Sequence, residues 1–277
     1  MRMRIVDAFT DRPFAGNPAG VLLLDASAFP DEHWMQRVAS EVNLSETAFA
    51  HPLEGSAKEA ADADWALRWF TPATEVALCG HATLATAHVL FSTGAATSRV
   101  RFATRGGVLS VRPADGGAFT MDFPTAPLTA TAPPAAVARA LGAQPLTGYD
   151  TGPDVGDLLV ELADEATVRA LAPDFAALAA LGPRGVIATA AAEDPSRGYD
   201  FVSRGFFPAV GVDEDPVTGS AHTALAPFWS ARLGRAELTG LQVSARTGLV
   251  RTELRGDRVL LTGTAVTVID GELHAAL

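Results

Sequence analysis

Two stretches of this chain repeat each other and decide its fold. The first is Arg68-Trp69-Phe70-Thr71-Pro72 followed by Leu78-Cys79-Gly80-His81-Ala82-Thr83. The second is Arg204-Gly205-Phe206-Phe207-Pro208 followed by Val217-Thr218-Gly219-Ser220-Ala221-His222. The two arginines are 136 positions apart, and the glycines of the two following turns are 139 apart. Because the order is kept and the offset grows slowly, the pattern indicates an internal duplication.

Two further pairs of matched segments agree with this duplication. Gly16 and Gly20 precede an apolar stretch, as do Gly152 and Gly156, again with an offset of 136. Later, Arg105-Gly106-Gly107-Val108 matches Arg246-Thr247-Gly248-Leu249. Glycine and alanine are abundant in this chain, so matches between them could arise by chance. The match of the Arg-x-Phe-x-Pro motif involves neither residue type. We therefore predict two equivalent halves.

The Pro-rich stretch between the halves lacks periodicity and reads as a linker. We place the halves at residues 1–125 and 135–277, with the linker at 126–134, and the C-terminal segment free to pack back on the first half. Each half is expected to be α+β, a curved, mostly antiparallel sheet resembling a barrel around a central helix, with the two matched turns facing each other across a cleft.

The helices are predicted from apolar spacing and from breakers. One should span residues 31–41, with Trp34, Met35 and Val38 as its apolar stripe, and another should run from Gly80 to about residue 91. In the second half, Pro227 falls inside the matching helix, so we expect a kink or an early end there.

Composition narrows the class of protein. The net charge of −11 argues against binding to nucleic acid or to anionic lipid. No apolar run has the length of a membrane span, and the single cysteine, Cys79, excludes an internal disulfide and any multi-cysteine metal site. We expect a cytoplasmic protein without membrane contact.

Glu46 is the first candidate for chemistry. It is a lone carboxylate in the strand-like stretch Asn43-Leu44-Ser45-Glu46-Thr47-Ala48-Phe49. A strand exposes alternate residues, so Glu46 is either a solvent-facing strand residue or a buried acid with a task. The approximate repeat partner of this stretch, Ile187-Ala188-Thr189-Ala190, carries no acid, so the fold itself does not require one.

The two matched helix starts supply the other candidates. Free N–H groups at Gly80 and Gly219 could bind a small carboxylate. His81 lies in the first of these turns, and the alternative for it is a buried, hydrogen-bonded histidine. Asp213-Glu214-Asp215 precede the second turn, where acids can cap a helix, although three exceed what capping needs. A carboxylate, a histidine and a serine, Ser220, suit proton transfer.

Other chemistries lack their motifs. The chain contains no phosphate-binding G-x-x-x-x-G-K-[ST], no H-E-x-x-H and no G-x-S-x-G. Its histidines do not fall at familiar metal-ligand spacings. We therefore predict neither a metal nor a cofactor.

The quoted segments resemble the PhzF-like phenazine-biosynthesis family, together with Val6-Asp7-Ala8-Phe9-Thr10 and Phe14-Ala15-Gly16-Asn17-Pro18. The resemblance implies the diaminopimelate-epimerase fold, commonly as a homodimer, and an isomerase that relocates a proton without metal or cofactor. PhzF itself, after which the family is named, performs this reaction on trans-2,3-dihydro-3-hydroxyanthranilic acid. The resemblance implies the following roles: Glu46 as general acid/base, His81 and Asp215 as catalytic partners, and Asn17, Gly80, Ala82, Gly219, Ser220 and Ala221 as substrate-binding residues.

The expected function is thus a cofactor-independent isomerase acting on a small carboxylate-bearing substrate. Epimerases of this fold use a cysteine at each matched turn, whereas here Cys79 is matched by Thr218, whose hydroxyl is a poor proton carrier near neutral pH. Two alternatives stay open: a one-base epimerase or racemase of an amino acid, and a non-catalytic binding protein on the same fold.

Overall fold

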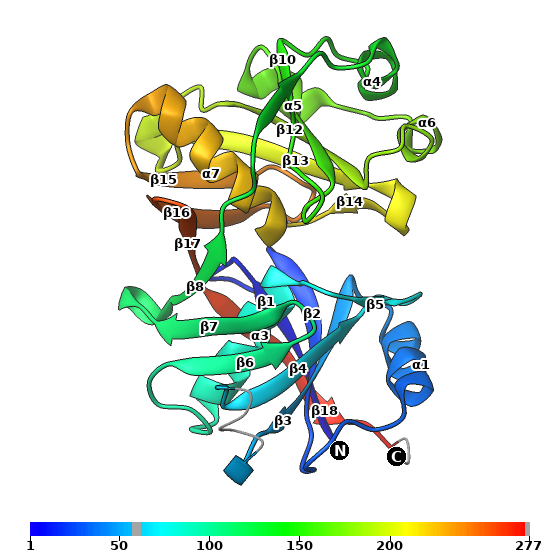
Figure 1. Ribbon diagram of the computed structural model, residues 1–277, viewed down its shortest axis with the longest axis vertical. Helices are drawn as coiled ribbons and strands as arrows, with labels where there is room; N and C mark the ends of the chain where they lie inside the picture. Colours follow the sequence, from blue (N-terminus) through cyan, green and yellow to red (C-terminus); the bar gives the residue numbers. More distant parts are fainter. Residues whose placement is uncertain (57–61, 275–277) are drawn as a thin grey trace. The chain divides into compact units, whose positions relative to one another are not determined.

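The computed structural model describes residues 1–56 and 62–274. Two compact units make up the chain: Met1–Asp122 joined by Thr262–Leu277, and Phe123–Leu261. Each combines a curved sheet with a few helices (Figure 1). Among the described residues, no helix is both long enough and apolar enough to cross a membrane.

In the first unit, a run of antiparallel pairings is interrupted twice by parallel ones. Strand β18 pairs with β1 and β1 with β2, both antiparallel, whereas β2 pairs with β3 in parallel. Strand β4 then pairs antiparallel with β3 and β5 and parallel with β6. The strands are β1 (Arg2–Ala8), β2 (Asn17–Leu23), β3 (Glu46–Pro52), β4 (Trp65–Phe70), β5 (Glu75–Val76), β6 (Val100–Thr104), β7 (Gly107–Pro113), β8 (Phe119–Pro124) and β18 (Ala265–Glu272).

The second unit repeats these pairings. Strand β9 pairs with β10 and β10 with β11, both antiparallel, and β11 pairs with β12 in parallel. Strand β13 pairs antiparallel with β12 and β14 and parallel with β15. The strands are β9 (Thr129–Thr131), β10 (Thr147–Asp150), β11 (Asp157–Glu161), β12 (Gly185–Ala191), β13 (Phe201–Phe207), β14 (Val212–Asp215), β15 (Glu237–Gln242), β16 (Gly248–Arg255) and β17 (Arg258–Gly263).

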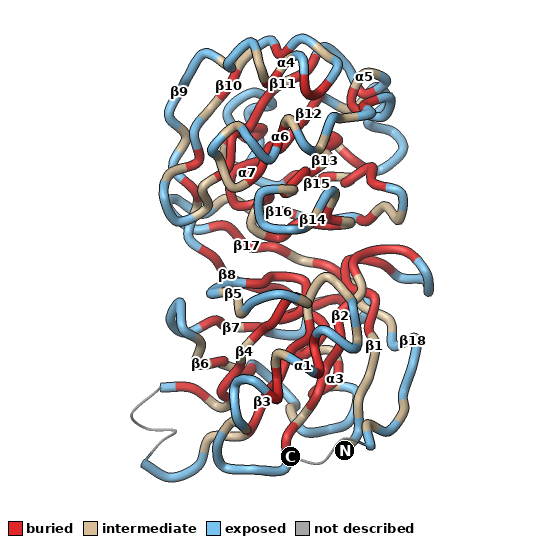
Figure 2. Tube along the Cα trace, turned by 90° about the vertical axis from the view of Figure 1, so that its right-hand side faces the viewer, coloured by how far each residue is buried: buried red, intermediate tan, exposed pale blue. Residues whose placement is uncertain are grey.

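One apolar helix is central to each unit. Helix α3 (Gly80–Ser92) packs on β1, β2 and β3, and α7 (Gly219–Leu233) packs on β15 and β16. Residues all around both helices are buried, as expected of helices enclosed by their sheet. Figure 2 shows both helices as mostly buried, whereas strand β9 and many connecting turns are exposed. The helix predicted after Gly80 is confirmed.

Pro227 does not end its helix. Helix α7 continues to Leu233, so of the two expected outcomes, a kink or an early end, the early end is not observed. A proline has no N–H for the carbonyl four residues earlier, which is Thr223. The backbone N–H of Ala126 donates to that carbonyl at 3.1 Å instead. The segment predicted as a linker thus satisfies the helix, and it also contributes the short strand β9.

Helix α1 (Glu32–Val42) matches the helix predicted at residues 31–41. Asp31 caps it by accepting hydrogen bonds from the backbone of its first turn, and Asn43 ends it in the left-handed conformation. Its apolar stripe, Trp34, Met35 and Val38, is buried against strands of the first unit, as predicted.

The second unit buries both faces of its sheet. Within β11, Val160 belongs to an apolar cluster that includes buried side chains of the short helices α4, α5 and α6, whose bounds follow. Its neighbour Leu159 belongs to a second apolar cluster that includes buried side chains of α7. Successive side chains of a strand point to opposite faces, so a run of apolar residues fits this position. Among the described residues, the other helical segments are short: α4 (Ala135–Leu141), α5 (Glu165–Ala170), α6 (Phe175–Ala179), η2 (Pro195–Arg197) and η3 (Pro208–Val210) in the second unit, and η1 (Asp115–Gly117) in the first.

The arginine of the repeated Arg-x-Phe-x-Pro motif forms an equivalent ion pair in each unit, and we call this the duplicated ion pair. Arg68 donates two hydrogen bonds to Glu75, at 2.7 and 2.6 Å, and Arg204 donates two to Glu214, at 2.7 and 2.8 Å. Each guanidinium also lies over the ring of the phenylalanine two residues later. The distances to the ring centroids are 5.2 Å for Arg68 and 5.0 Å for Arg204. Charge, stacking and bidentate geometry together explain why this motif needs arginine rather than lysine.

Candidate active site

The loop before β2 places Asn17. Gly16 has a φ of +64°, and a Cβ atom there would lie 2.1 Å from the carbonyl oxygen of Ala8, so only glycine fits. The Asp7 carboxylate accepts a hydrogen bond from the backbone N–H of Phe14 at 2.7 Å and holds the loop. Asn17 is therefore fixed at the first position of β2 with no exposed surface.

Glu46 occupies the corresponding first position of β3. Strands β2 and β3 run parallel, and Ala19 is its Cα partner. Its side chain is 16% exposed. Of the two alternatives left by the sequence, the mostly buried acid is the one observed.

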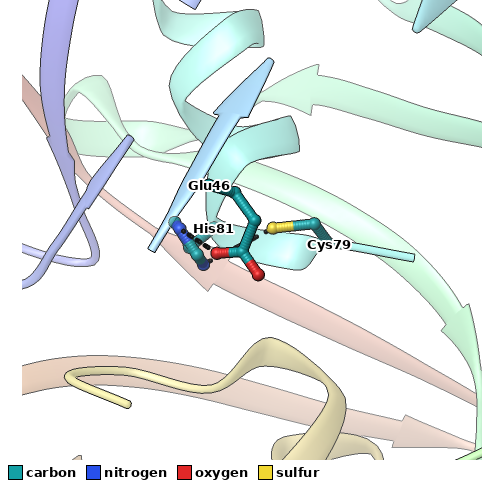
Figure 3. A group of neighbouring side chains, drawn as sticks. All are labelled: Glu46, Cys79 and His81. Carbon is teal, nitrogen blue, oxygen red and sulfur yellow. Dashed lines mark hydrogen bonds and ion pairs between the residues drawn. The ribbon is translucent and has the colours of Figure 1, made fainter. Parts of the chain in front are cut away.

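His81, the second residue of α3, connects these two strands. Its Nε2 lies 3.2 Å from Oε2 of Glu46, and its Nδ1 lies 3.0 Å from Nδ2 of Asn17. The Cys79 sulfur lies 3.6 Å from the same Nδ1. Figure 3 shows the Glu46 carboxylate and the Cys79 thiol converging on the imidazole. Three elements thus bring four polar side chains into one cluster.

Burial fixes the protonation state of His81. It lowers the pKa of the ring from 6.5 to about 3, so the imidazole is neutral near pH 7. A neutral ring has one proton, and the carboxylate at Nε2 can only accept it. Nδ1 is then an acceptor, which matches the amide N–H₂ of Asn17 and the Cys79 thiol. These contacts form a directed chain: Asn17 and Cys79 donate to Nδ1, which leaves the ring proton on Nε2, 3.2 Å from Oε2 of Glu46.

The same side chains include metal-ligand types. Among residues 1–56 and 62–274, one ligand atom each of Glu46, Cys79 and His81 lies within 4.8 Å of the others. However, Cys79 and Glu46 meet opposite nitrogens of the imidazole, whereas a single cation binds one of them. The imidazole therefore separates the thiol from the carboxylate and does not place both around one shared metal position.

At the start of α7, Asp215 serves a polar network. Thr218 donates its hydroxyl proton to Oδ2 of Asp215 at 2.6 Å. Gln242, which is buried on β15, accepts from the backbone N–H of Thr218 at 2.8 Å and donates to the backbone carbonyl of Asp215 at 2.7 Å. Gln242 was not predicted from the sequence, although a glutamine within the apolar pattern of β15 is a usable signal.

The acidic run before α7 divides into different tasks. Glu214 forms the ion pair with Arg204, Asp215 accepts from Thr218, and Asp213 is exposed. Three acids in a row are thus not a helix cap. One belongs to the duplicated ion pair and another to the polar network.

Ser220 contacts a residue that the sequence analysis did not single out. Arg184 donates to Oγ of Ser220 at 3.3 Å, and to the carboxylate of Asp157 at 2.9 and 2.7 Å. Asp157 is the first residue of β11, as Asn17 is of β2. The acidic start of an apolar strand was the available signal.

The two helix starts share one backbone device. The side chain of the fourth residue of each helix donates to the backbone carbonyl of the N-cap residue. Oγ1 of Thr83 donates to Cys79 at 2.6 Å, and Nδ1 of His222 donates to Thr218 at 2.8 Å. Burial lowers the pKa of His222 to about 4, so it is neutral near pH 7 with its proton on Nδ1.

The remaining predicted binding residues are backbone positions. Gly80 and Gly219 begin the two helices, and Ala82 and Ala221 are buried. Their contribution to a ligand is thus confined to backbone N–H groups at helix starts.

The position matching Glu46 is a glycine. Thr47 pairs with Phe70 and Val186 pairs with Phe206, so the preceding residues, Glu46 and Gly185, correspond. A Cβ at Gly185 would lie 2.1 Å from Cδ1 of Phe207. This correspondence moves the approximate partner stretch, predicted at residues 187–190, towards the N-terminus, and it confirms that the second unit holds no acid there.

Two pseudo-equivalent α+β units, each with an apolar central helix, are the architecture of the epimerase-like fold. The chain overlays a hydroxyproline epimerase of Agrobacterium vitis with a TM-score of 0.60 at 14% identity, covering 98% of this chain and 91% of that one, which shows the fold alone. The predicted fold class is confirmed.

The particular family follows from closer matches. The family model "Phenazine biosynthesis-like protein" matches residues 6–271, and the chain belongs to this family. An uncharacterized isomerase of Pseudomonas aeruginosa is 49% identical over 270 residues, 97% of each chain. A PhzF-family crystal structure from Enterococcus faecalis has a TM-score of 0.88 at 40% identity, covering 99% of both chains. The resemblance predicted from the motifs is confirmed, and the relatives are of the isomerase kind.

Proposed function

We propose that this protein is an isomerase that relocates a proton on a small carboxylate-bearing substrate, with Glu46 as the general acid/base. One carboxylate can take a proton from carbon and return it to another, so the reaction needs no cofactor. We further propose His81 and Asp215 as its catalytic partners. Asn17, Gly80, Ala82, Gly219, Ser220 and Ala221 are proposed as the residues that bind and position the substrate.

One observation carries this proposal: a neutral His81 whose Nε2 lies 3.2 Å from the Glu46 carboxylate. A neutral imidazole donates one hydrogen bond without neutralising the carboxylate, so Glu46 rests as a base. When Glu46 takes a proton, the same N–H stays in place to orient the acid for the return step. Such a one-carboxylate path is suited to a proton shift within one substrate molecule.

The contact between Asn17 and His81 gives Asn17 a second task. Nδ2 of Asn17 donates to Nδ1 of His81 at 3.0 Å, and the side chain is fully buried. We propose that Asn17 acts chiefly as a positioning residue that sets the tautomer of His81.

The test is exchange of substrate hydrogen with solvent. A panel of small cyclic or unsaturated amino and hydroxy acids, including trans-2,3-dihydro-3-hydroxyanthranilic acid, is incubated in D₂O and followed by NMR. Glu46→Gln should slow deuterium uptake by roughly 10²–10⁴-fold, the usual contribution of a general base. Glu32→Gln, at the exposed start of α1, is the matched control and should exchange at the wild-type rate. Undiminished exchange in Glu46→Gln would exclude the proposed role.

An amino-acid epimerase is the second candidate, because Cys79 brings another proton-bearing group 3.6 Å from His81. Chiral chromatography of amino acids left with the protein distinguishes the two. Interconversion of enantiomers supports epimerisation, and deuterium uptake with a shifted double bond supports the isomerase.

A further inference from the structure

Arg184 is held in one orientation by a buried acid. The Asp157 side chain has no exposed surface, and it accepts two hydrogen bonds from the Arg184 guanidinium, from Nε at 2.9 Å and from Nη2 at 2.7 Å. The guanidinium also lies 5.0 Å from the centroid of the Phe207 ring. Burial raises the pKa of Asp157, and the facing guanidinium opposes this shift. The acid thereby fixes one edge of a cation whose side chain remains 38% exposed.

The exposed cation reaches the start of α7. Nη2 of Arg184 donates to Oγ of Ser220 at 3.3 Å, and Ser220 is the second residue of that helix. A hydroxyl oxygen that accepts from a guanidinium keeps its own proton for donation. A permanent cation, a hydroxyl donor and the positive end of a helix dipole thus lie together, and all three favour an anion.

Different chemistry surrounds the start of α3 in the first unit. There the first residues of β2 and β3, Asn17 and Glu46, both contact the second residue of α3, His81. In the second unit, Asp157 begins β11, Ser220 is the second residue of α7, and Arg184 precedes the glycine that matches Glu46. An arginine stays charged at every relevant pH, so it serves binding rather than proton transfer.

We propose that Arg184 is a specificity-determining residue that binds a carboxylate of the ligand together with the Ser220 hydroxyl. This inference rests on the proposed function only for the identity of that ligand as the substrate. The chemistry it selects is a planar anion, because a guanidinium and a neighbouring hydroxyl offer parallel donors to two oxygens of one carboxylate. A neutral amide of the same shape forfeits the charge-assisted part of the contact.

Benzoate and benzamide are the probes, because they differ in charge and hardly in shape. Their dissociation constants are measured by ligand-observed NMR for the wild type and for Asp157→Asn/Arg184→Met. The double substitution is used because an arginine variant alone leaves the buried Asp157 carboxylate unpaired, which destabilises a fold strongly. The matched control is Glu165→Gln/Arg169→Met, another pair in the second unit, with side chains 2% and 39% exposed.

The wild type and the control should bind benzoate at least about tenfold more tightly than benzamide, the usual gain from a hydrogen bond to a charged group. In Asp157→Asn/Arg184→Met the benzoate affinity should fall at least about tenfold, while the benzamide affinity stays unchanged. Unchanged benzoate binding in this variant overturns the proposal, and so does an equal loss in the control. If circular dichroism shows this variant to be unfolded, Arg184→Lys decides. Lysine keeps the positive charge but lacks the planar guanidinium that can donate two parallel hydrogen bonds. Benzoate binding should therefore weaken and benzamide binding should not. Unchanged benzoate binding overturns the proposal.

The two proposals fail separately. Glu46→Gln keeps the Arg184 contact and should bind benzoate as the wild type does, while losing deuterium exchange. Arg184-dependent benzoate binding without any solvent exchange supports an anion site and removes the isomerase. Exchange that persists with Arg184-independent benzoate binding supports the isomerase and removes this inference.

Discussion

The starts of α3 and α7 share their backbone conformation and a hydrogen bond to the cap carbonyl, but different side chains surround them. Each follows an extended N-cap residue, Cys79 or Thr218, and each has its fourth residue bonded to the cap carbonyl. Around the α3 start lie groups that can exchange a proton, Glu46 and a neutral His81. Around the α7 start lie a fixed cation and a hydrogen-bonded acid, Arg184 and Asp215.

This difference teaches how a duplicated fold becomes one-sided. Both units keep a side-chain hydrogen bond to the carbonyl of the helix N-cap residue. The side chains around the two helix starts differ, and at Gly185, which matches Glu46, the Phe207 ring occupies the space that a Cβ atom would need. The proposed general acid/base, Glu46, thus belongs to the first unit, and the proposed anion-binding arginine, Arg184, belongs to the second.

The largest expected effect concerns the two buried histidines. The folded-state pKa values of His81 and His222, about 3 and about 4, lie below 6.5, so the unfolded chain binds protons first as the pH falls. Their contribution to stability is complete above about pH 6.5 and is lost progressively towards pH 4 and 3, by up to about 1.4 kcal/mol per pH unit for each. Urea unfolding should show roughly 4 kcal/mol less stability at pH 5 than at pH 7.5 from these two groups.

A substitution separates the histidines. His222→Thr copies Thr83, the matching residue of α3, and should keep the hydrogen bond to the cap carbonyl. Its stability difference between pH 7.5 and pH 5 should be about half that of the wild type, because only His81 then contributes. An acid response equal to that of the wild type would show that His222 takes no part in it.

The next effect tests the directed chain at the α3 start. In Asn17→Asp the donor at Nδ1 of His81 becomes a carboxylate, so the ring should gain a second proton and weaken Glu46 as a base. Deuterium exchange should slow roughly 10²-fold, within the range of general-base effects. Nitrogen-15 NMR provides the readout that a purely structural role would not change: a ring protonated on Nε2 alone in the wild type and on both nitrogens in the variant. A wild-type ring protonated on Nδ1 alone would contradict the assigned direction of the chain.

A smaller effect tests the correspondence between Glu46 and Gly185. Gly185→Ala places a methyl group 2.1 Å from the Phe207 ring, so the free energy of unfolding should fall by about 2 kcal/mol, a usual cost of overpacking. Gly271→Ala, in β18, is the matched control, since a Cβ there meets nothing within 4 Å. Equal stability of the two variants in urea would mean that the second unit tolerates a side chain where the first carries its acid.

Much of this comparison could be predicted from the sequence. Periodicity and matched motifs identified the repeat, helix α1 and the helix that begins at Gly80, because these features are local. The cluster at Glu46 could only be nominated residue by residue, since it needs β2, β3 and α3 to meet. Spacing also could not foresee that Ala126 would satisfy the carbonyl opposite Pro227, nor that Arg184 would reach Ser220, because these contacts depend on register between distant segments.

The smallest expected effect concerns the cap residues themselves, Cys79 and Thr218. A thiol that faces an acceptor nitrogen must donate its proton, so Cys79 should rest protonated and support His81 rather than act as a second base. A serine hydroxyl can donate in the same way, so Cys79→Ser should change the exchange rate by less than about threefold, the scale of one weak hydrogen bond. If that variant instead loses exchange to the extent of Glu46→Gln, the first unit uses two proton carriers and the amino-acid epimerase becomes the better description. The matching substitution, Thr218→Ser, keeps the donor to Asp215 and should leave exchange unchanged, so any difference between the two variants would measure how far the paired caps have diverged.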